Sequence, residues 1–200
     1  MKKIFGILPL TILGLFLSGH SGILPIGAPI PNPEVKMKDI SGKDISFKDA
    51  MQKNGLLVMF SCNTCPIVKR YQTRSNELCK YATQKQVGVI LLNSNEAYRD
   101  NGDSYEDSKA YGQQNKYTWH YVMDEQSKMA DAFGANRTPE IFLFNSDGKL
   151  VYHGAIDDNS DSEEGVTRRH AQIAIDELVG GKDISTKETR SVGCTIKRKS

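Results

Sequence analysis

Apolar residues occur along the chain in short blocks of two kinds, separated by polar segments. Two blocks, 56–60 and 87–92, are continuously apolar, which is typical of strands buried on both faces of a sheet. Other blocks repeat apolar residues at helical spacing, as Ile67, Tyr71 and Leu78 do. The expected strands are 56–60, 87–92, 120–123, 140–145 and 149–153, and the expected helices are 64–83, 104–116, 125–133 and 167–179.

The order of these elements predicts an α/β fold with a mixed sheet. Strands that alternate with helices pair in parallel. The last two strands flank Ser146-Asp147-Gly148, a hairpin signal that adds antiparallel pairing at one side. A further hairpin or strand-turn is expected across residues 35–47.

The two ends of the chain differ from this pattern. Residues 1–22 have a basic start, an apolar run of about 14 residues and a small-residue exit, as secretory signal peptides do. That run is shorter than the ~20 residues of a membrane span, so no stable span is expected after cleavage, and an uncleaved anchor is the alternative. We expect an exported, periplasmic protein with a linker at 23–33, one domain at 34–181 and a basic, polar tail at 182–200.

The charge and cysteine counts exclude two classes of protein. Lys and Arg number 26 and Asp and Glu 24, and the excess of two is Lys2 and Lys3, so the chain without residues 1–22 is formally neutral. A nucleic-acid partner would require a basic surface and is not expected. Four cysteines are too few for a disulfide-scaffolded fold of 200 residues.

Two of the cysteines form the motif Cys62-Asn63-Thr64-Cys65, between an expected strand and an expected helix. At a helix start, unpaired N–H groups and the helix dipole favour a thiolate, so Cys62 is the expected nucleophile. Cys65, one turn further on, can attack a mixed disulfide on Cys62 and release the partner. Pro66 excludes a haem-attachment motif, which needs histidine there, and no second cysteine pair completes a zinc site. We expect no metal and no cofactor.

Several segments together resemble the thioredoxin superfamily, in particular its bacterial peroxiredoxin-like redoxins (AhpC/TSA-like) and thiol–disulfide isomerases. The matching segments are FSCNTCPIVKRY at 60–71, LLNSNE at 91–96, SYEDSKAYGQQNKY at 104–117, TPEIFLFNSDGKLVYHGAIDD at 138–158 and VGCTIKRK at 192–199. The resemblance implies a thioredoxin-like three-layer α/β/α sandwich with a mixed central sheet. It also implies that Thr138-Pro139 is the cis-proline loop of the substrate groove and that the tail docks on the domain.

The sequence departs from its relatives at several motif positions. Thioredoxins usually carry Trp before the first cysteine and Asp six residues before it, whereas this chain has Ser61 and Leu56. The peroxiredoxin pattern Pro-x-x-x-Thr-x-x-Cys fits neither motif cysteine: its Pro and Thr positions are Val58 and Cys62 in register with Cys65, and Gly55 and Met59 in register with Cys62. Peroxide would lose the hydroxyl contact that normally positions it.

The remaining cysteines, Cys79 and Cys194, are open to more than one interpretation. A continuous helix places Cys79 about 21 Å along the axis from Cys65, so it bridges neither motif cysteine. It is either a buried, inert thiol or the partner of Cys194 in a structural disulfide, which we favour for an exported chain. Alternatively, a docked tail brings Cys194 to the dithiol as a third redox residue.

These observations favour an exported thiol–disulfide oxidoreductase. Cys62 and Cys65 exchange disulfides, Thr138 and Pro139 shape the groove, and the partners are protein thiols or disulfides and a thiol electron donor. One alternative is a peroxiredoxin-like thiol peroxidase, an antioxidant that uses the same dithiol. The other is a thioredoxin-fold assembly factor that carries copper on Cys62, Cys65 and His153, since soft thiolates suit Cu(I).

Overall fold

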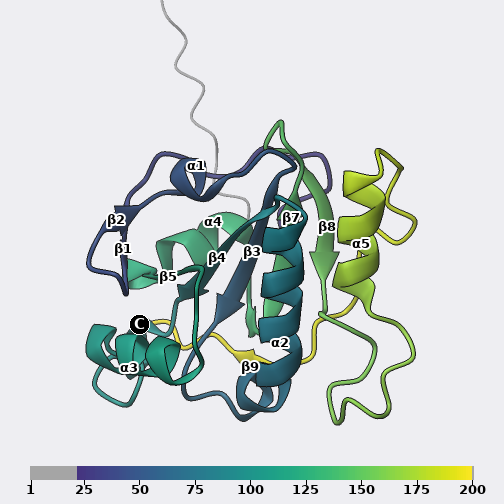
Figure 1. The fold of residues 1–200 in the computed structure, drawn as a ribbon. Helices are drawn as coiled ribbons and strands as arrows, with labels where there is room; N and C mark the ends of the chain where they lie inside the picture. The colour runs from purple at the N-terminus through teal and green to yellow at the C-terminus, as the bar shows by residue number, and fades with distance from the viewer. Residues whose placement is uncertain (1–21, 200) are drawn as a thin grey trace, which may run out of the picture.

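A seven-stranded mixed sheet forms the centre of the protein in a computed structural model, which describes residues 22–199 (Figure 1). The strands are β1 Met37–Asp39, β2 Asp44–Ile45, β3 Leu56–Ser61, β4 Gly88–Asn93, β5 His120–Met123, β6 Arg137–Thr138, β7 Glu140–Phe144, β8 Leu150–Gly154 and β9 Cys194–Thr195. The helices are α1 Phe47–Ala50, α2 Pro66–Gln84, α3 Tyr105–Gln114, α4 Lys128–Phe133 and α5 His170–Val179, with short 3-10 segments η1 Glu96–Tyr98 and η2 Glu125–Ser127. The expected signal peptide, apart from Gly22, lies outside the described residues.

The strand order of the sheet is β2-β1-β5-β4-β3-β7-β8. The central strands β3, β4 and β5 are parallel, whereas β7 and β8 add the predicted antiparallel hairpin beside β3. Every residue of β3 and β4 is buried, which explains why their sequences are continuously apolar rather than alternating. Parallel pairing brings the ends of β3 and β4 to one edge of the sheet, so the segments that follow them lie close together.

Helices cover both faces of the sheet, and the residues of β3 alternate between two apolar clusters. Leu57 and Met59 belong to the cluster under α2 and α5. Leu56, Val58 and Phe60 belong to the cluster under α1 and α4 on the opposite face. Figure 1 shows α2 and α5 side by side on one face of the sheet. The predicted three-layer α/β/α sandwich with a mixed sheet is confirmed.

The main difference from the expected elements is at 125–133, where the sequence predicts one helix. Gln126 and Ser127 have positive φ values of 57° and 54°, which separate η2 from α4. The Asp124 carboxylate accepts hydrogen bonds from the N–H groups of Met129 and Ala130, at 2.8 and 2.9 Å. These bonds satisfy the first-turn donors of α4 and define a separate helix start.

The segment 23–33, expected to be a linker, is hydrogen-bonded to the domain. Gly27 N donates to Leu150 O, and Leu150 N donates to Ala28 O, at 2.8 and 2.9 Å. These bonds place the segment beside the start of β8. The prolines and glycines of this segment therefore belong to a paired, extended stretch of the fold.

The chain after α5 runs back along β8 before it reaches the cysteine motif. His153 N donates to Lys187 O at 2.9 Å, and Thr189 N donates to His153 O at 3.0 Å. The chain then forms β9, which pairs with β6 in a small second sheet. No helix within residues 22–199 is both long and apolar enough to cross a membrane.

Candidate active site

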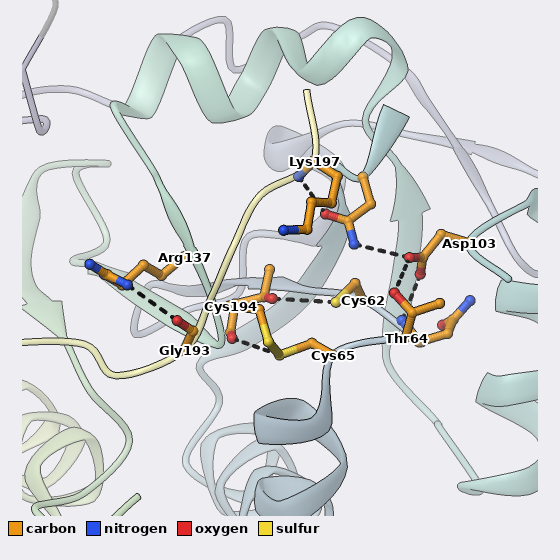
Figure 2. The surroundings of a disulfide bond; sticks show 11 residues. Cys62, Thr64, Cys65, Asp103, Arg137, Gly193, Cys194 and Lys197 are labelled. Carbon is orange, nitrogen blue, oxygen red and sulfur yellow. Dashed lines mark hydrogen bonds between the residues drawn. A yellow bond between two sulfur atoms is a disulfide. The ribbon is translucent and has the colours of Figure 1, made fainter. Parts of the chain in front are cut away.

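The Cys62-Asn63-Thr64-Cys65 motif lies between the end of β3 and the start of α2 (Figure 2). Cys65 is the N-cap residue of α2, and Pro66 follows in the first turn, where its missing N–H group is not needed. The backbone N–H groups of Cys65 and Thr64 lower the pKa of the Cys62 thiol. The predicted nucleophile therefore lies at the positive end of the helix.

Thr138 contacts both motif cysteines. The Thr138–Pro139 peptide bond is cis, the isomer that the resemblance implies. Thr138 Oγ1 lies 3.3 Å from Cys62 Sγ, and Thr138 O lies 3.4 Å from Cys65 Sγ. The structure thus brings the predicted catalytic and groove residues into one cluster.

Cys65 forms a disulfide bond with Cys194, and their Cα atoms are 6.0 Å apart. Cys62 and Cys79 are free thiols, so the favoured bridge between Cys79 and Cys194 is wrong. Cys79 lies 14 residues further along α2, within the apolar cluster under the sheet, whereas the tail crosses the start of that helix. Of the alternatives for Cys194, the structure has the one in which it reaches the motif.

The C-terminal segment is held against the site as a strand. β9 pairs antiparallel with β6, with Cys194 opposite Thr138 and Thr195 opposite Arg137. Arg137 Nη1 donates to Gly193 O at 3.2 Å. A Cβ atom on Gly193 would lie 2.2 Å from Thr138 O, so this close approach of the two strands requires glycine.

Asp103 organises the turn that carries the motif, and the sequence analysis missed it. It lies in the loop before α3, is fully buried and faces the motif (Figure 2). Its carboxylate accepts four hydrogen bonds of 2.6–2.9 Å, from Asn63 N, Thr64 Oγ1, Asn93 Nδ2 and Asn95 Nδ2. Because β3 and β4 are parallel, the loops after them meet at this edge. The sequence signal for this polar network was the pair Asn93 and Asn95, polar residues that come directly after an apolar strand.

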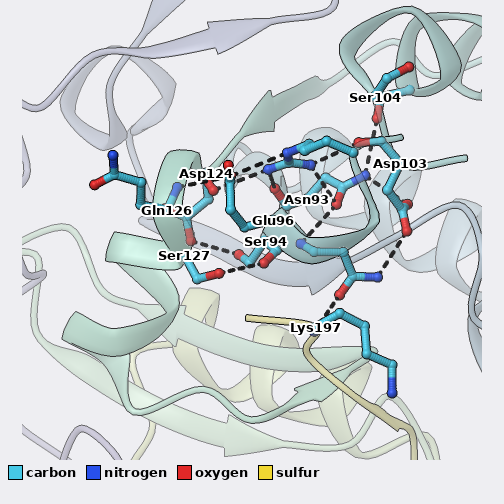
Figure 3. A network of polar contacts seen from close by, with 12 residues as sticks. Asn93, Ser94, Glu96, Asp103, Ser104, Asp124, Gln126, Ser127 and Lys197 are labelled. Atoms are coloured by element: carbon cyan, nitrogen blue, oxygen red, sulfur yellow. Dashed lines mark hydrogen bonds and ion pairs between the residues drawn. The ribbon is translucent and has the colours of Figure 1, made fainter. Parts of the chain in front are cut away.

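The same network fastens the tail (Figure 3). Asn95 Oδ1 accepts a hydrogen bond from Lys197 N at 2.9 Å, while Ala97 N donates to Lys197 O at 2.8 Å. Asn95 thus links the backbone of the C-terminal segment to the Asp103 carboxylate. The position of the tail and the position of the motif are connected through two buried side chains.

Glu140 organises the other side of the site, the turn that contains Thr138. One carboxylate oxygen accepts hydrogen bonds from Asn136 N and Arg137 N, at 2.9 and 3.1 Å. The other oxygen lies 2.9 Å from His153 Nε2 on β8. Glu140 and His153 are both buried. A charged residue at the start of the apolar run EIFLF was the sequence signal for this role.

Comparison with known proteins gives a family for this arrangement. The sequence model described as the AhpC/TSA family matches residues 26–153, which include the cysteine motif and the cis-proline loop. The chain belongs to the AhpC/TSA family. It is a thioredoxin-fold redox protein, as the resemblance implied. No curated protein matches the sequence.

Solved structures similar to this AhpC/TSA family member include proteins without an assigned activity. An uncharacterized conserved protein from Geobacillus kaustophilus is 31% identical with a TM-score of 0.81, covering 88% of this chain and 93% of that chain. A hypothetical protein from Sinorhizobium meliloti 1021 is 28% identical, also with a TM-score of 0.81, over 88% and 96%. A PrxQ mutant from Xylella fastidiosa is 14% identical, with a TM-score of 0.58 over 79% and 97%, and shares the fold.

Cys62 is held as a thiol in this structure. Burial raises the pKa of the Cys62 thiol above its ordinary range, against the hydrogen bond from Thr138, which lowers it. The negative charge of Asp103 raises this pKa further. The helix start, which led us to expect a thiolate, is thus outweighed by burial while the tail covers the site.

The free energy of unfolding should therefore depend on pH through the ionisation of the two buried thiols. The pKa values of Cys62 and Cys79 are both raised by burial, so the unfolded chain ionises these thiols at lower pH than the folded protein. We expect the free energy of unfolding to fall as the pH rises above about 8.5, the ordinary thiol pKa. Urea unfolding between about pH 7 and pH 9 measures this. The fall should shrink in a variant with Cys62→Ser and Cys79→Ala, and an equal fall in that variant would contradict the assignment.

His153, which the copper-carrying alternative would use, is engaged elsewhere. Its ring nitrogen lies against Glu140, and its ring packs on Phe142 with centroids 4.5 Å apart. Among residues 22–199, no group of three or more His, Cys, Asp or Glu side chains is arranged to hold a metal ion. The copper alternative therefore gains no support from the geometry.

Proposed function

We propose that this AhpC/TSA family member is an exported thiol–disulfide oxidoreductase that exchanges disulfides with protein thiols through Cys62 and Cys65. One observation carries the proposal: a free thiol at a helix start lies in the same apolar cluster as a disulfide. Cys62, Cys65 and Val68 form this cluster, and Cys194 packs against it. Export is supported by the sequence pattern of residues 1–22.

The geometry supports a division of labour between the two motif cysteines. The backbone N–H groups at the start of α2 and the Thr138 hydroxyl lower the pKa of Cys62, so they stabilise its thiolate once the site is open to water. It would attack a substrate disulfide and form a mixed disulfide. Once a thiol electron donor has reduced the Cys65–Cys194 disulfide, Cys65 would attack the sulfur of Cys62, the Cys62–Cys65 disulfide would form, and the substrate thiol would leave.

The test is the equilibrium of the cysteines with glutathione buffers, followed by alkylation and mass mapping. We expect the Cys62–Cys65 pair to change between dithiol and disulfide with the glutathione ratio, and the protein to exchange disulfides with a cystine-containing peptide. Cys62→Ser should abolish the exchange, and Cys79→Ala, which removes the other free thiol, should leave it unchanged. Exchange by Cys62→Ser at the rate of the wild type would refute the proposal.

A thiol peroxidase is the second candidate, favoured by membership of the AhpC/TSA family and by the disulfide at Cys65. The peroxiredoxin motif fits neither register: Val58 and Cys62 stand at its proline and threonine positions when it is aligned on Cys65, and Gly55 and Met59 when it is aligned on Cys62. Stopped-flow addition of hydrogen peroxide to the reduced protein distinguishes the two candidates. Oxidation no faster than that of free cysteine would exclude the peroxidase.

A further inference from the structure

The C-terminal segment closes the site in which exchange is proposed. Cys62 has no exposed surface (0%), although the proposed function requires it to meet a substrate. β9 occupies the edge of β6 beside the cis-proline, and its disulfide partner is Cys65 itself. A substrate strand can reach this edge only after β9 has left it.

The chemistry that can release the tail is already present. Cys65 Sγ is bonded to Cys194, and Cys62, the only other motif cysteine, is a free thiol in the same apolar cluster. Thr138 contacts both motif sulfurs, through its hydroxyl at 3.3 Å and its carbonyl at 3.4 Å. Thr138 thus contacts both the nucleophile, Cys62, and the disulfide that it can attack, Cys65–Cys194.

We propose that Cys194 is a third catalytic cysteine: attack by Cys62 on the Cys65–Cys194 disulfide forms the Cys62–Cys65 disulfide and frees the C-terminal strand. The proposal rests on the proposed function, because it opens the groove and forms the Cys62–Cys65 disulfide, which a protein substrate thiol can attack in the oxidising direction of the exchange. It assigns to Cys194 the role of leaving group in the opening step and of attacking thiol when the site closes again.

The step is balanced within the chain. Cys62 first loses the proton that its burial favours, and the resulting thiolate attacks Cys65 Sγ; the new Cys62–Cys65 bond forms while the Cys65–Cys194 bond breaks. Cys194 leaves with the electron pair and takes up a proton in place of the one that Cys62 lost. One thiol and one disulfide exist before and after, so neither an oxidant nor a reductant is consumed.

Once the disulfide has moved, the strand is held by non-covalent contacts alone. Ile196 N donates to Asn136 O at 3.0 Å, and Lys197 is bonded to Asn95 and Ala97. Arg198 pairs with Asp131, and this pair is partly exposed to solvent. Such partly exposed pairs contribute little to stability. The segment before them stays attached through Thr189 and His153, so the release is confined to the chain beyond Thr189.

The experiment labels free thiols in the oxidised protein without reductant. The full protein is incubated with N-ethylmaleimide and sampled over time, digested with trypsin and mapped. Trypsin places both motif cysteines on the peptide 54–69, Cys194 on 191–197 and Cys79 on 75–80. Transfer of the disulfide gives a labelled 191–197 peptide together with a 54–69 peptide that carries an internal disulfide.

We expect labelling of 191–197 in the wild type, and at least tenfold slower labelling of it in Cys62→Ser and Cys62→Ala. Thermal unfolding and circular dichroism of both variants show whether they keep the fold. Cys79→Ala is the matched control and should label 191–197 at the wild-type rate. Equal labelling of this peptide in folded Cys62→Ser would overturn the proposal. So would a wild type that labels only Cys62 while 54–69 and 191–197 stay linked.

The two proposals fail in different ways. If the wild type exchanges with a cystine-containing peptide but never labels 191–197, the role of Cys194 is wrong and the oxidoreductase function stands. If 191–197 is labelled but no substrate disulfide is exchanged, the internal transfer occurs and the proposed function is wrong.

Discussion

Replacing Asp103 by alanine is expected to lower the free energy of unfolding by about 3–5 kcal/mol. The carboxylate accepts four hydrogen bonds and is fully buried, so its removal leaves the Asn63 N–H group and two side-chain amides without their acceptor. Hydrogen bonds to a charged group contribute about 1.5–3 kcal/mol each, and a shared network makes their sum less than additive. Urea unfolding of the oxidised protein measures the loss.

Asp100→Ala is the matched control for this change, because Asp100 is exposed in the same loop. It should change the free energy of unfolding by no more than about 0.5 kcal/mol. Equal losses in the two variants would show that the Asp103 hydrogen bonds do not hold the motif.

Asp103→Asn gives a second readout at the cysteine itself. The charge of Asp103 raises the pKa of Cys62, so its removal is expected to lower that pKa. In a Cys79→Ala background Cys62 is the only free thiol, and ultraviolet absorbance of the thiolate reports its titration. An unchanged or higher pKa would contradict the electrostatic role.

Replacing Glu140 by alanine is expected to have the second largest effect and to lower the free energy of unfolding by about 2–4 kcal/mol. The N–H groups of Asn136 and Arg137 lose a charged acceptor, and buried His153 loses its partner. Thr138 follows directly on this turn and contacts both motif cysteines. Disulfide exchange with a cystine-containing peptide should therefore slow as well.

Glu140→Gln keeps the size of the side chain and one carbonyl acceptor, so it should lose less stability than Glu140→Ala. Glu125→Ala, at an exposed glutamate, is the matched control and should be close to neutral. A stable Glu140→Ala variant that exchanges at the wild-type rate would show that the turn positions Thr138 without this carboxylate.

The sequence predicts features that depend on neighbouring residues. The apolar runs of β3 and β4, the hairpin at Ser146-Asp147-Gly148 and the cysteine motif at a helix start are local patterns, and the structure has each of them. The cis-proline loop is accessible only through the resemblance, because a proline before a strand is common in turns.

The sequence does not predict the partner of Cys194. Its disulfide closes across 129 residues of chain, and neither Cys65 nor Cys79 carries a local pattern that selects it. Asp103 was missed for a related reason: it lies in a polar loop, and the partners of its carboxylate come from two other segments of the chain, the cysteine motif and the end of β4. Such long-range contacts are set by the sheet topology, which places the ends of β3 and β4 together.

The path of the tail along β8 limits what its release can do. β8 is an outer strand of the sheet, and unpaired outer strands invite aggregation or pairing with a second molecule. Here the N-terminal segment pairs with Leu150 at one end of β8, and Thr189 pairs with His153 at the other. These bonds lie outside the part of the tail that carries Cys194. The site can therefore open repeatedly while the sheet stays protected against self-association.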